Sequence, residues 1–230
     1  MKSLIFALLL SGTLSATAAE LKSEPKFDRS IPQSTKEQIT NDLGWVRSIQ
    51  GKGASALYKT IFVSNALNGG ELYSFFAERI HTFSMNDCGG GGSVAACVIP
   101  WMDSSTMWIT KNYLNNNIPQ IFRVSIIFHE SRHTEEDHGN WTHARCPVPY
   151  LDENGKDIVG IISGAKMEGL AACDTTNLGA YGLQAVLLKN IEKNCTNCSE
   201  KMLMDAKLYG DDAIYRISNL PQRAQLKNDN

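Results

Sequence analysis

The 230-residue sequence lacks the features that would point to a nucleic acid or a membrane. Its formal net charge is only −2, and its basic residues are scattered along the chain, which argues against a nucleic-acid partner. Apart from a short apolar run near the start, no stretch approaches the length needed to cross a bilayer. No internal repeat and no linker-like segment divides the chain. These absences favour a single domain built around one core.

The first 19 residues have the pattern of a secretory signal peptide. Lys2 supplies the positive start, residues 4–10 form an apolar core, and residues 16–19 are small enough for a cleavage site. The apolar run is too short to serve as an anchor, and no cysteine at the cleavage region offers a lipid attachment site. We therefore expect a protein that is secreted or periplasmic after cleavage near Ala19, with no membrane anchor.

All six cysteines lie after this segment. An even number of cysteines in an exported chain is typical of disulfides. Proximity along the chain favours three pairs, which are Cys88–Cys97, Cys146–Cys173 and Cys195–Cys198. Only the last pair has the CxxC spacing, so a zinc site made of cysteines is disfavoured. A thioredoxin-like redox site is also disfavoured, because no βαβ pattern surrounds that pair.

Hydrophobic periodicity predicts an α+β fold, mainly helical, with a small sheet or hairpin. We expect a flexible N-terminal arm over residues 20–33, the domain over residues 34–220, and a polar, frayed tail over residues 221–230. Helices are expected over residues 34–50, 71–83, 177–194 and 199–217, and over a segment that begins near residue 120. Short strands are expected over residues 94–101, 106–110 and 158–162, and a helical turn over residues 166–172. Residues 56–64 fit either a helix or a strand.

Four of the five histidines fall within residues 121–143. The centre of this stretch, His129-Glu-Ser-Arg-His133, has the pattern HExxH and follows a strongly apolar segment typical of a buried helix. Residues four apart lie on one face of a helix, so the two imidazoles aim at one point, as zinc ligands do. Glu130 points about 100° away from His129, which suits contact with a water on the metal rather than with the metal. The alternative is a pair of hydrogen-bonded histidines near a helix end.

Catalytic zinc usually has three protein ligands and a water, so a third ligand is expected from elsewhere. The candidates are His138, His143, Glu168 and Asp174. A continuing helix would turn His138 away from the other two histidines, whereas His143 lies beyond a glycine where the chain can fold back. A Cys146–Cys173 bridge would bring His143 beside Asp174, one as ligand and the other as its hydrogen-bonded support. We expect His143 as the ligand, with Asp174 and Glu168 as open alternatives.

The HExxH segment resembles the zinc-binding helix of the zincin metallopeptidases. The resemblance covers about residues 121–182, and it implies that His129 and His133 bind zinc while Glu130 acts as general base. The combination of HExRH with later His-x-x-Cys, Cys-Asp and Gly-Ala-Tyr-Gly segments is also similar to poorly characterised exported bacterial proteins. A zincin-like catalytic domain over residues 34–220 follows from this resemblance.

The zincin subfamilies differ in the third ligand, and this chain departs from each. The metzincin pattern HExxHxxGxxH is not met, because Glu136 and Gly139 occupy its glycine and last histidine positions. The gluzincin pattern needs a downstream helical glutamate, which Glu168 could be. The aspzincin pattern needs an aspartate closer to Tyr181-Gly182 than Asp174 is.

The function expected from these residues is that of an exported zinc-dependent hydrolase, a metallopeptidase that acts on a peptide or protein. Glu130 would move the proton of a zinc-bound water, and Tyr181 is a candidate donor to the oxyanion, although it could instead be a packed aromatic. Arg132 could orient Glu130 or Asp174, or form only a surface salt bridge. A strand pair before the metal-binding helix could hold an extended peptide at an open sheet edge.

Two other functions fit the same sequence. One is a secreted, non-catalytic binding module in which a metal only stabilises the fold. The other is an immunity or inhibitor-type protein that relies on disulfides alone and binds no metal. The sequence is silent on the oligomeric state and on whether peptides or cell-wall crosslinks are cut.

Overall fold

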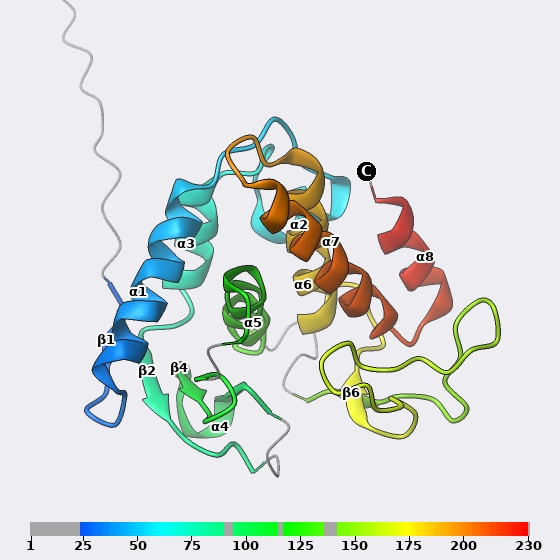
Figure 1. The fold of residues 1–230 in the computed structure, drawn as a ribbon, viewed down its shortest axis with the longest axis horizontal. Helices are drawn as coiled ribbons and strands as arrows, with labels where there is room; N and C mark the ends of the chain where they lie inside the picture. The colour runs from blue at the N-terminus through cyan, green and yellow to red at the C-terminus, as the bar shows by residue number, and fades with distance from the viewer. Residues whose placement is uncertain (1–23, 90–93, 115–116, 136–141, 230) are drawn as a thin grey trace, which may run out of the picture.

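The computed structural model describes residues 24–89, 94–114, 117–135 and 142–229, and it has the α+β architecture expected from the sequence (Figure 1). The expected signal peptide lies outside the described residues. The longer helices, which carry most of the core, are α1 Gln33–Ser48, α3 Gly69–Ala77, α5 Gln120–Arg132, α6 Ala180–Asn194, α7 Glu200–Tyr215 and α8 Leu220–Asn228. Two shorter helices are α2 Ala56–Phe62 and α4 Pro100–Asp103. Within the described residues, no helix is both long and apolar enough to cross a membrane.

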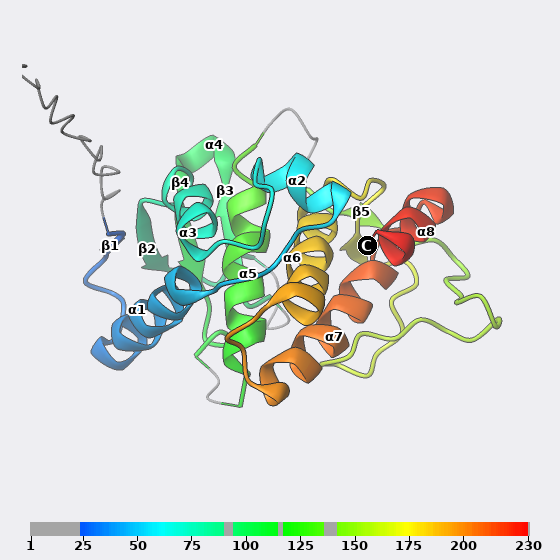
Figure 2. The same ribbon diagram turned by 90° about the horizontal axis from the view of Figure 1, so that it is seen from above.

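Helix α5 lies at the centre of the molecule. Figures 1 and 2 show it between a half that contains the larger sheet with α1 and α3 and a half that contains α6, α7 and α8. Its side chains Val124, Ile127 and Phe128 are at most 1% exposed, because neighbours cover the helix from both halves. A helix that is apolar all round is stable only in such a buried position.

The larger sheet has the order β1-β2-β4-β3. Its strands are β1 Lys26–Phe27, β2 Thr82–Met85, β4 Ser104–Ile109 and β3 Ala96–Ile99. Strands β1, β2 and β4 run parallel, whereas β3 pairs antiparallel with β4 and forms one edge. The expected hairpin over residues 94–110 is therefore confirmed, with α4 as its connection.

A second sheet consists only of β5 Ala144–Arg145 and β6 Ala171–Cys173, which pair antiparallel. All three expected disulfides are present, and one of them, Cys146–Cys173, joins the ends of these two short strands. A two-stranded ribbon of this size is not stable alone. The cross-link holds it in place and thereby fixes the residues that flank it.

Both ends of the described chain are better ordered than expected. The segment expected to be a flexible arm contributes β1, and its Ile31 is only 3% exposed. The expected frayed tail is helix α8, in which Arg223 and Leu226 are 1% and 3% exposed. Arg223 donates through Nε to the Ile217 carbonyl and through Nη2 to the Tyr150 hydroxyl. The expectation failed because these few buried contacts outweigh the polar composition of each segment.

Three local expectations in the interior of the chain were also wrong. Helix α3 ends at Ala77 rather than near residue 83, because Thr82–Met85 pair with two neighbouring strands. Residues 158–162 form no strand, only an isolated bridge between Val159 and Lys166. The expected helical turn over residues 166–172 gives way to strand β6, which pairs with β5. In the first and third cases a strand distant in sequence decided the local structure.

Docking of α8 should contribute measurably to stability. We expect Leu226→Ala to lower the free energy of unfolding by about 2–5 kcal/mol, because it leaves a cavity where a leucine is buried. Urea denaturation followed by circular dichroism measures this change. The exposed neighbour Ala224, changed to Ser, serves as the control and should cost less than about 0.5 kcal/mol. Equal midpoints for both variants would mean that α8 does not pack as described.

Candidate metal centre

Three histidines converge at the C-terminal end of α5. The Nε2 atoms of His129 and His133 lie 3.2 Å apart, and they lie 3.1 Å and 3.3 Å from Nε2 of His143. His129 occupies the last turn of α5 and His133 caps it, so the helical spacing places both on one face. His143 reaches them from the residue before β5. The expected set of His129, His133 and His143 is therefore brought together.

These separations fit a metal ion. A tetrahedral metal with nitrogen ligands at about 2.0–2.1 Å separates those nitrogens by about 3.3 Å, which is close to the observed 3.1–3.3 Å. Each histidine offers one ligand atom, and among the described residues no further His, Cys, Asp or Glu joins the group. The three side chains can thus hold one metal ion and leave a position for a further ligand.

A hydrogen-bond chain fixes which nitrogen of His129 carries the proton. Ser125 Oγ donates to the Phe122 carbonyl at 2.8 Å, so it accepts from Gln184 Nε2 at 2.9 Å. Gln184 therefore presents its oxygen to His129 Nδ1 at 3.2 Å. Since an amide oxygen can only accept, Nδ1 of His129 is protonated and Nε2 carries a lone pair.

Asp174 fixes the tautomer of His143 in the same way. Its Oδ1 lies 2.8 Å from His143 Nδ1, and its Oδ2 accepts the backbone N–H of Tyr181 at 2.8 Å. A carboxylate in this place keeps the proton on Nδ1 and leaves the Nε2 lone pair for a metal. Asp174 is thus the support of the third histidine, as the sequence suggested, and His143 is the candidate ligand.

Without a cation this arrangement is unfavourable. The Nε2 atoms of His129 and His143 face each other with lone pairs and no hydrogen between them. A proton is a poor substitute for a metal, since burial and the two neighbouring histidines hold the pKa of His129 well below its usual value. A divalent ion satisfies all three nitrogens at once.

Glu130 follows His129 in α5 and is 6% exposed. Its Oε2 accepts the backbone N–H of Val98 at 3.1 Å, which ties α5 to the edge strand β3. Burial raises the pKa of Glu130 to about 8, and this hydrogen bond offsets the effect only in part. Within the described part of the chain Glu130 forms no ion pair, so a nearby cation would stabilise its charged form.

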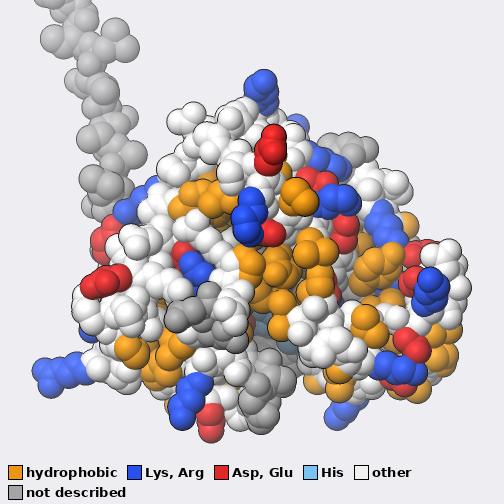
Figure 3. Space-filling model, viewed as in Figure 1, with side chains coloured by type: hydrophobic (Ala, Val, Ile, Leu, Met, Phe, Trp, Pro, Cys, Tyr) orange, Lys and Arg blue, Asp and Glu red, His pale blue; other side chains and the backbone are white. Residues whose placement is uncertain are grey.

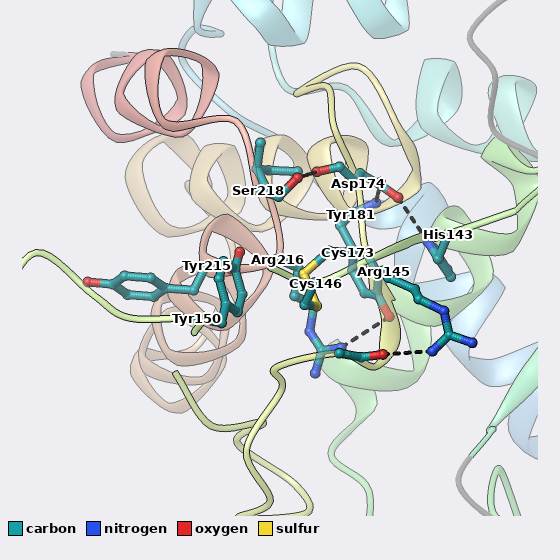
Figure 4. Close-up of a disulfide and its surroundings, with 12 residues drawn as sticks. His143, Arg145, Cys146, Tyr150, Cys173, Asp174, Tyr181, Tyr215, Arg216 and Ser218 are labelled. Carbon is teal, nitrogen blue, oxygen red and sulfur yellow. Dashed lines mark hydrogen bonds and ion pairs between the residues drawn. A yellow bond between two sulfur atoms is a disulfide. The ribbon is translucent and has the colours of Figure 1, made fainter. Parts of the chain in front are cut away.

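The β5–β6 ribbon and its disulfide place both halves of the His143–Asp174 pair. His143 precedes β5 and Asp174 follows β6, while Ala144 pairs with Cys173 across the ribbon. Figure 4 shows His143 and Asp174 on the same side of the Cys146–Cys173 bridge. Cys146 and Cys173 are 2% and 0% exposed. The buried disulfide therefore fixes the positions of His143 and Asp174 relative to each other.

Tyr181, the expected oxyanion donor, packs directly against the metal ligands. Its ring centre lies 4.5 Å from those of both His129 and His143. Its hydroxyl oxygen accepts a hydrogen bond from Arg216 Nη1 at 3.1 Å. Burial raises the pKa of Tyr181, so the hydroxyl keeps its proton at neutral pH.

The centre is accessible from one side. The side chain of His143 is 19% exposed. Figure 3 shows a small histidine surface at the bottom of a hollow between the two halves of the molecule. Apolar side chains lie above this hollow in the same view. Among the described residues, the three-histidine group is thus partly exposed at His143.

Other sequence candidates are not part of the centre. Arg132 pairs with Glu135 and donates to the Leu178 carbonyl at 2.8 Å. Because Arg132 is 3% exposed, this salt bridge is buried and not the surface pair that was the expected alternative. Glu168 is outside the histidine group. His138 lies outside the described residues.

Sequence reasoning missed two residues that the structure adds to the centre, Gln184 and Arg216. Gln184 lies three residues after Tyr181 and thus on the same face of α6. This spacing was a usable signal, because a helix that presents Tyr181 to the histidines also presents Gln184. Arg216 lies at the end of α7, and no motif in the sequence linked it to His129 or His143.

Metal titration tests the ligand set. We expect the protein to bind one zinc or cobalt ion, and His143→Ala to weaken that affinity at least about 100-fold, since even loss of a supporting partner costs 10–100-fold. Competition with a chelating dye measures the affinity. The exposed His81, changed to Ala, is the control and should bind the metal as the wild type does. Equal affinities for the two variants would remove His143 from the site.

Acid should release the metal. Protons and the metal compete for the same imidazole lone pairs, so the affinity should fall as the pH decreases. Because burial holds the pKa of His129 well below its usual value, we expect this fall below about pH 6.5. Repeating the dye competition at several pH values measures the trend. A metal affinity that is independent of pH in this range would contradict binding by neutral histidines.

Comparison with protein-family models, with curated proteins and with solved structures found no match to this chain. The resemblance to zincin metallopeptidases therefore rests on the HExxH motif and stays a prediction. The chemistry of the centre is inferred below from its own residues and geometry.

Proposed function

We propose that this protein is a zinc-dependent hydrolase, a metallopeptidase that acts on peptide or protein substrates. The observation that carries the proposal is a three-histidine group with a buried glutamate beside it and no fourth protein ligand among the described residues. Structural zinc sites are usually closed by four protein ligands, whereas catalytic sites keep one position for water. The non-catalytic binding module is less well supported for this reason.

Zinc is the metal proposed for the centre. Three neutral imidazoles are a ligand set that zinc accepts readily, and harder ions such as magnesium or calcium prefer oxygen ligands. When bound, zinc would lower the pKa of a coordinated water and polarise a carbonyl. The protein contributes the fixed tautomers of His129 and His143, which keep the lone pairs directed at the metal position.

Glu130 is proposed as the general base. One of its oxygens, Oε2, is held by the Val98 N–H, which fixes the carboxyl group of the residue next to His129 against β3. The other, Oε1, has no hydrogen-bond partner among the described residues and can accept a proton from water. Once a nearby cation stabilises the carboxylate, Glu130 can take that proton and return it to the leaving amine.

The edge strand β3 supports a peptide as substrate. Ala95 directs its carbonyl to β4, where it accepts from Thr110 N. Because backbone groups alternate along a strand, Ala96 and Val98 face the open edge. The Val98 N–H on that edge reaches Glu130. An extended peptide that pairs with β3 would therefore place its backbone next to the proposed base.

Tyr181 is proposed as the donor that stabilises the tetrahedral oxyanion of the substrate. Its ring packs against His129 and His143, and its protonated hydroxyl can donate a hydrogen bond. The three disulfides indicate an oxidising compartment. Together with the signal-peptide pattern of the sequence, they support a secreted or periplasmic protein.

Replacing the base separates metal binding from catalysis. We expect Glu130→Gln to keep one zinc ion but to lower kcat for an internally quenched peptide by about 10²–10⁴-fold, because proton transfer is lost. Metal analysis and fluorescence assays measure the two effects.

The matched control is Glu168→Gln, the same chemical change at a glutamate outside the histidine group, which should leave both properties unchanged. A wild-type protein that binds zinc but cleaves no member of a broad peptide panel would refute the catalytic proposal. Equal activity of Glu130→Gln and wild type would refute the role of Glu130.

A further inference from the structure

Arg216 contacts Tyr181, and no sequence motif indicated this contact. Its Nη1 lies 3.1 Å from the Tyr181 hydroxyl oxygen, and its guanidinium carbon lies 4.8 Å from the centre of the Tyr181 ring. Tyr181 in turn contacts His129 and His143. Figure 4 shows Arg216 and the end of the Tyr181 ring meeting below the disulfide. The guanidinium is thus one side chain away from the metal ligands.

The contact with Arg216 decides the direction of the Tyr181 hydroxyl. An arginine nitrogen can only donate, so Nη1 occupies a lone pair of the phenol oxygen and leaves its hydrogen unused. Among the described residues this hydrogen has no acceptor. The hydroxyl is therefore held as a donor toward a group that the protein itself does not supply.

Arg216 keeps further donor capacity of its own. Its Nε donates to Asp212 Oδ2 at 2.9 Å, and Asp212 Oδ1 also accepts the backbone N–H of Ile161 at 3.0 Å. Its Nη2 has no hydrogen-bond partner in the described part of the chain. Nη2 lies close to Gly160, where a Cβ would come within 3.5 Å of it.

A purely structural role would not need this arrangement. Asp212 and Arg216 lie four residues apart on α7 and form an ion pair. In addition, the guanidinium side chain, which is 18% exposed, reaches the tyrosine that packs against His129 and His143. Two neighbouring donors, the Tyr181 hydroxyl and Arg216 Nη2, thus have no acceptor among the described residues.

We propose that Arg216 is a positioning residue which holds Tyr181 as a one-directional donor, and that the two side chains together form an oxyanion-binding subsite. This inference rests on the proposed function for its catalytic meaning. The ligand is an oxygen anion, which is either the tetrahedral oxyanion of the reacting carbonyl or a carboxylate of the substrate. Charge-assisted donors of this kind bind such groups more strongly than neutral ones.

Binding of simple anions tests the subsite without any turnover. Zinc-loaded protein is titrated with inorganic phosphate and with acetate, and the affinities are compared for wild type, Tyr181→Phe, Arg216→Met and the double variant. We expect each single change to weaken the binding of at least one anion about tenfold. The double variant should bind more weakly than either single variant, but its loss should be smaller than the product of the two single losses, because Arg216 acts in part through Tyr181.

Controls separate this role from a structural one. Zinc affinity and melting temperature should stay close to wild type in Tyr181→Phe, which removes only the hydroxyl. Lys207→Met, an exposed cation on the same helix α7, should leave anion binding unchanged. Arg216→Lys keeps the positive charge but loses the planar guanidinium, so its anion affinity should lie between those of Arg216→Met and wild type.

Peptides with a free and with an amidated C-terminus show which oxygen anion the subsite binds. If Arg216→Met raises KM only for peptides with a free C-terminal carboxylate, the subsite recognises that carboxylate. If it lowers kcat equally for free and amidated peptides, the subsite stabilises the tetrahedral oxyanion. Unchanged anion binding in both single variants overturns the proposal, as does a double variant whose losses multiply. A protein that cleaves no peptide but shows the expected anion series would refute the peptidase function and leave the subsite standing.

Discussion

The convergence of three imidazole nitrogens is the constraint on which the site depends. His129, His133 and His143 bring their Nε2 atoms within 3.1–3.3 Å of one another. Gln184 and Asp174 hold the protons on the far side of two of the rings. Lone pairs forced together in this way are unfavourable until a cation binds them. The polar groups around the site thus form one preorganised unit rather than separate contacts.

The fold keeps this unit rigid by burying what surrounds it. Helix α5 is covered by neighbours from both halves of the molecule, so its final turn cannot shift to relieve the crowding of His129 and His133. The third histidine comes from a ribbon too short to be stable alone, and the Cys146–Cys173 bridge secures it. Two different sources of rigidity, a packed helix and a covalent link, therefore meet at the metal position.

Charge around the centre is distributed unevenly. The buried acids Glu130 and Asp174 lie on the side of the ligands and favour a bound cation, whereas Arg216 lies behind Tyr181 and favours an anion. The proposed hydrolase function draws on this division, because a cation and hydrogen-bond donors would both stabilise negative charge that develops on an oxygen. The edge strand β3 lies beside the same groups, because its Val98 N–H donates to Glu130.

The sequence by itself determined the α+β class, the three disulfide pairs and the HExxH helix, because helical spacing and cysteine proximity are local properties of the chain. It also singled out His143 and Asp174, since the disulfide that joins their neighbours was predictable from cysteine spacing. Only the tertiary structure decided that His143 is the candidate ligand and Asp174 its support, and it alone brought Gln184 and Arg216 to the centre. These choices depend on the packing of α6 and α7 against α5, which joins residues far apart in sequence and leaves no local pattern to read.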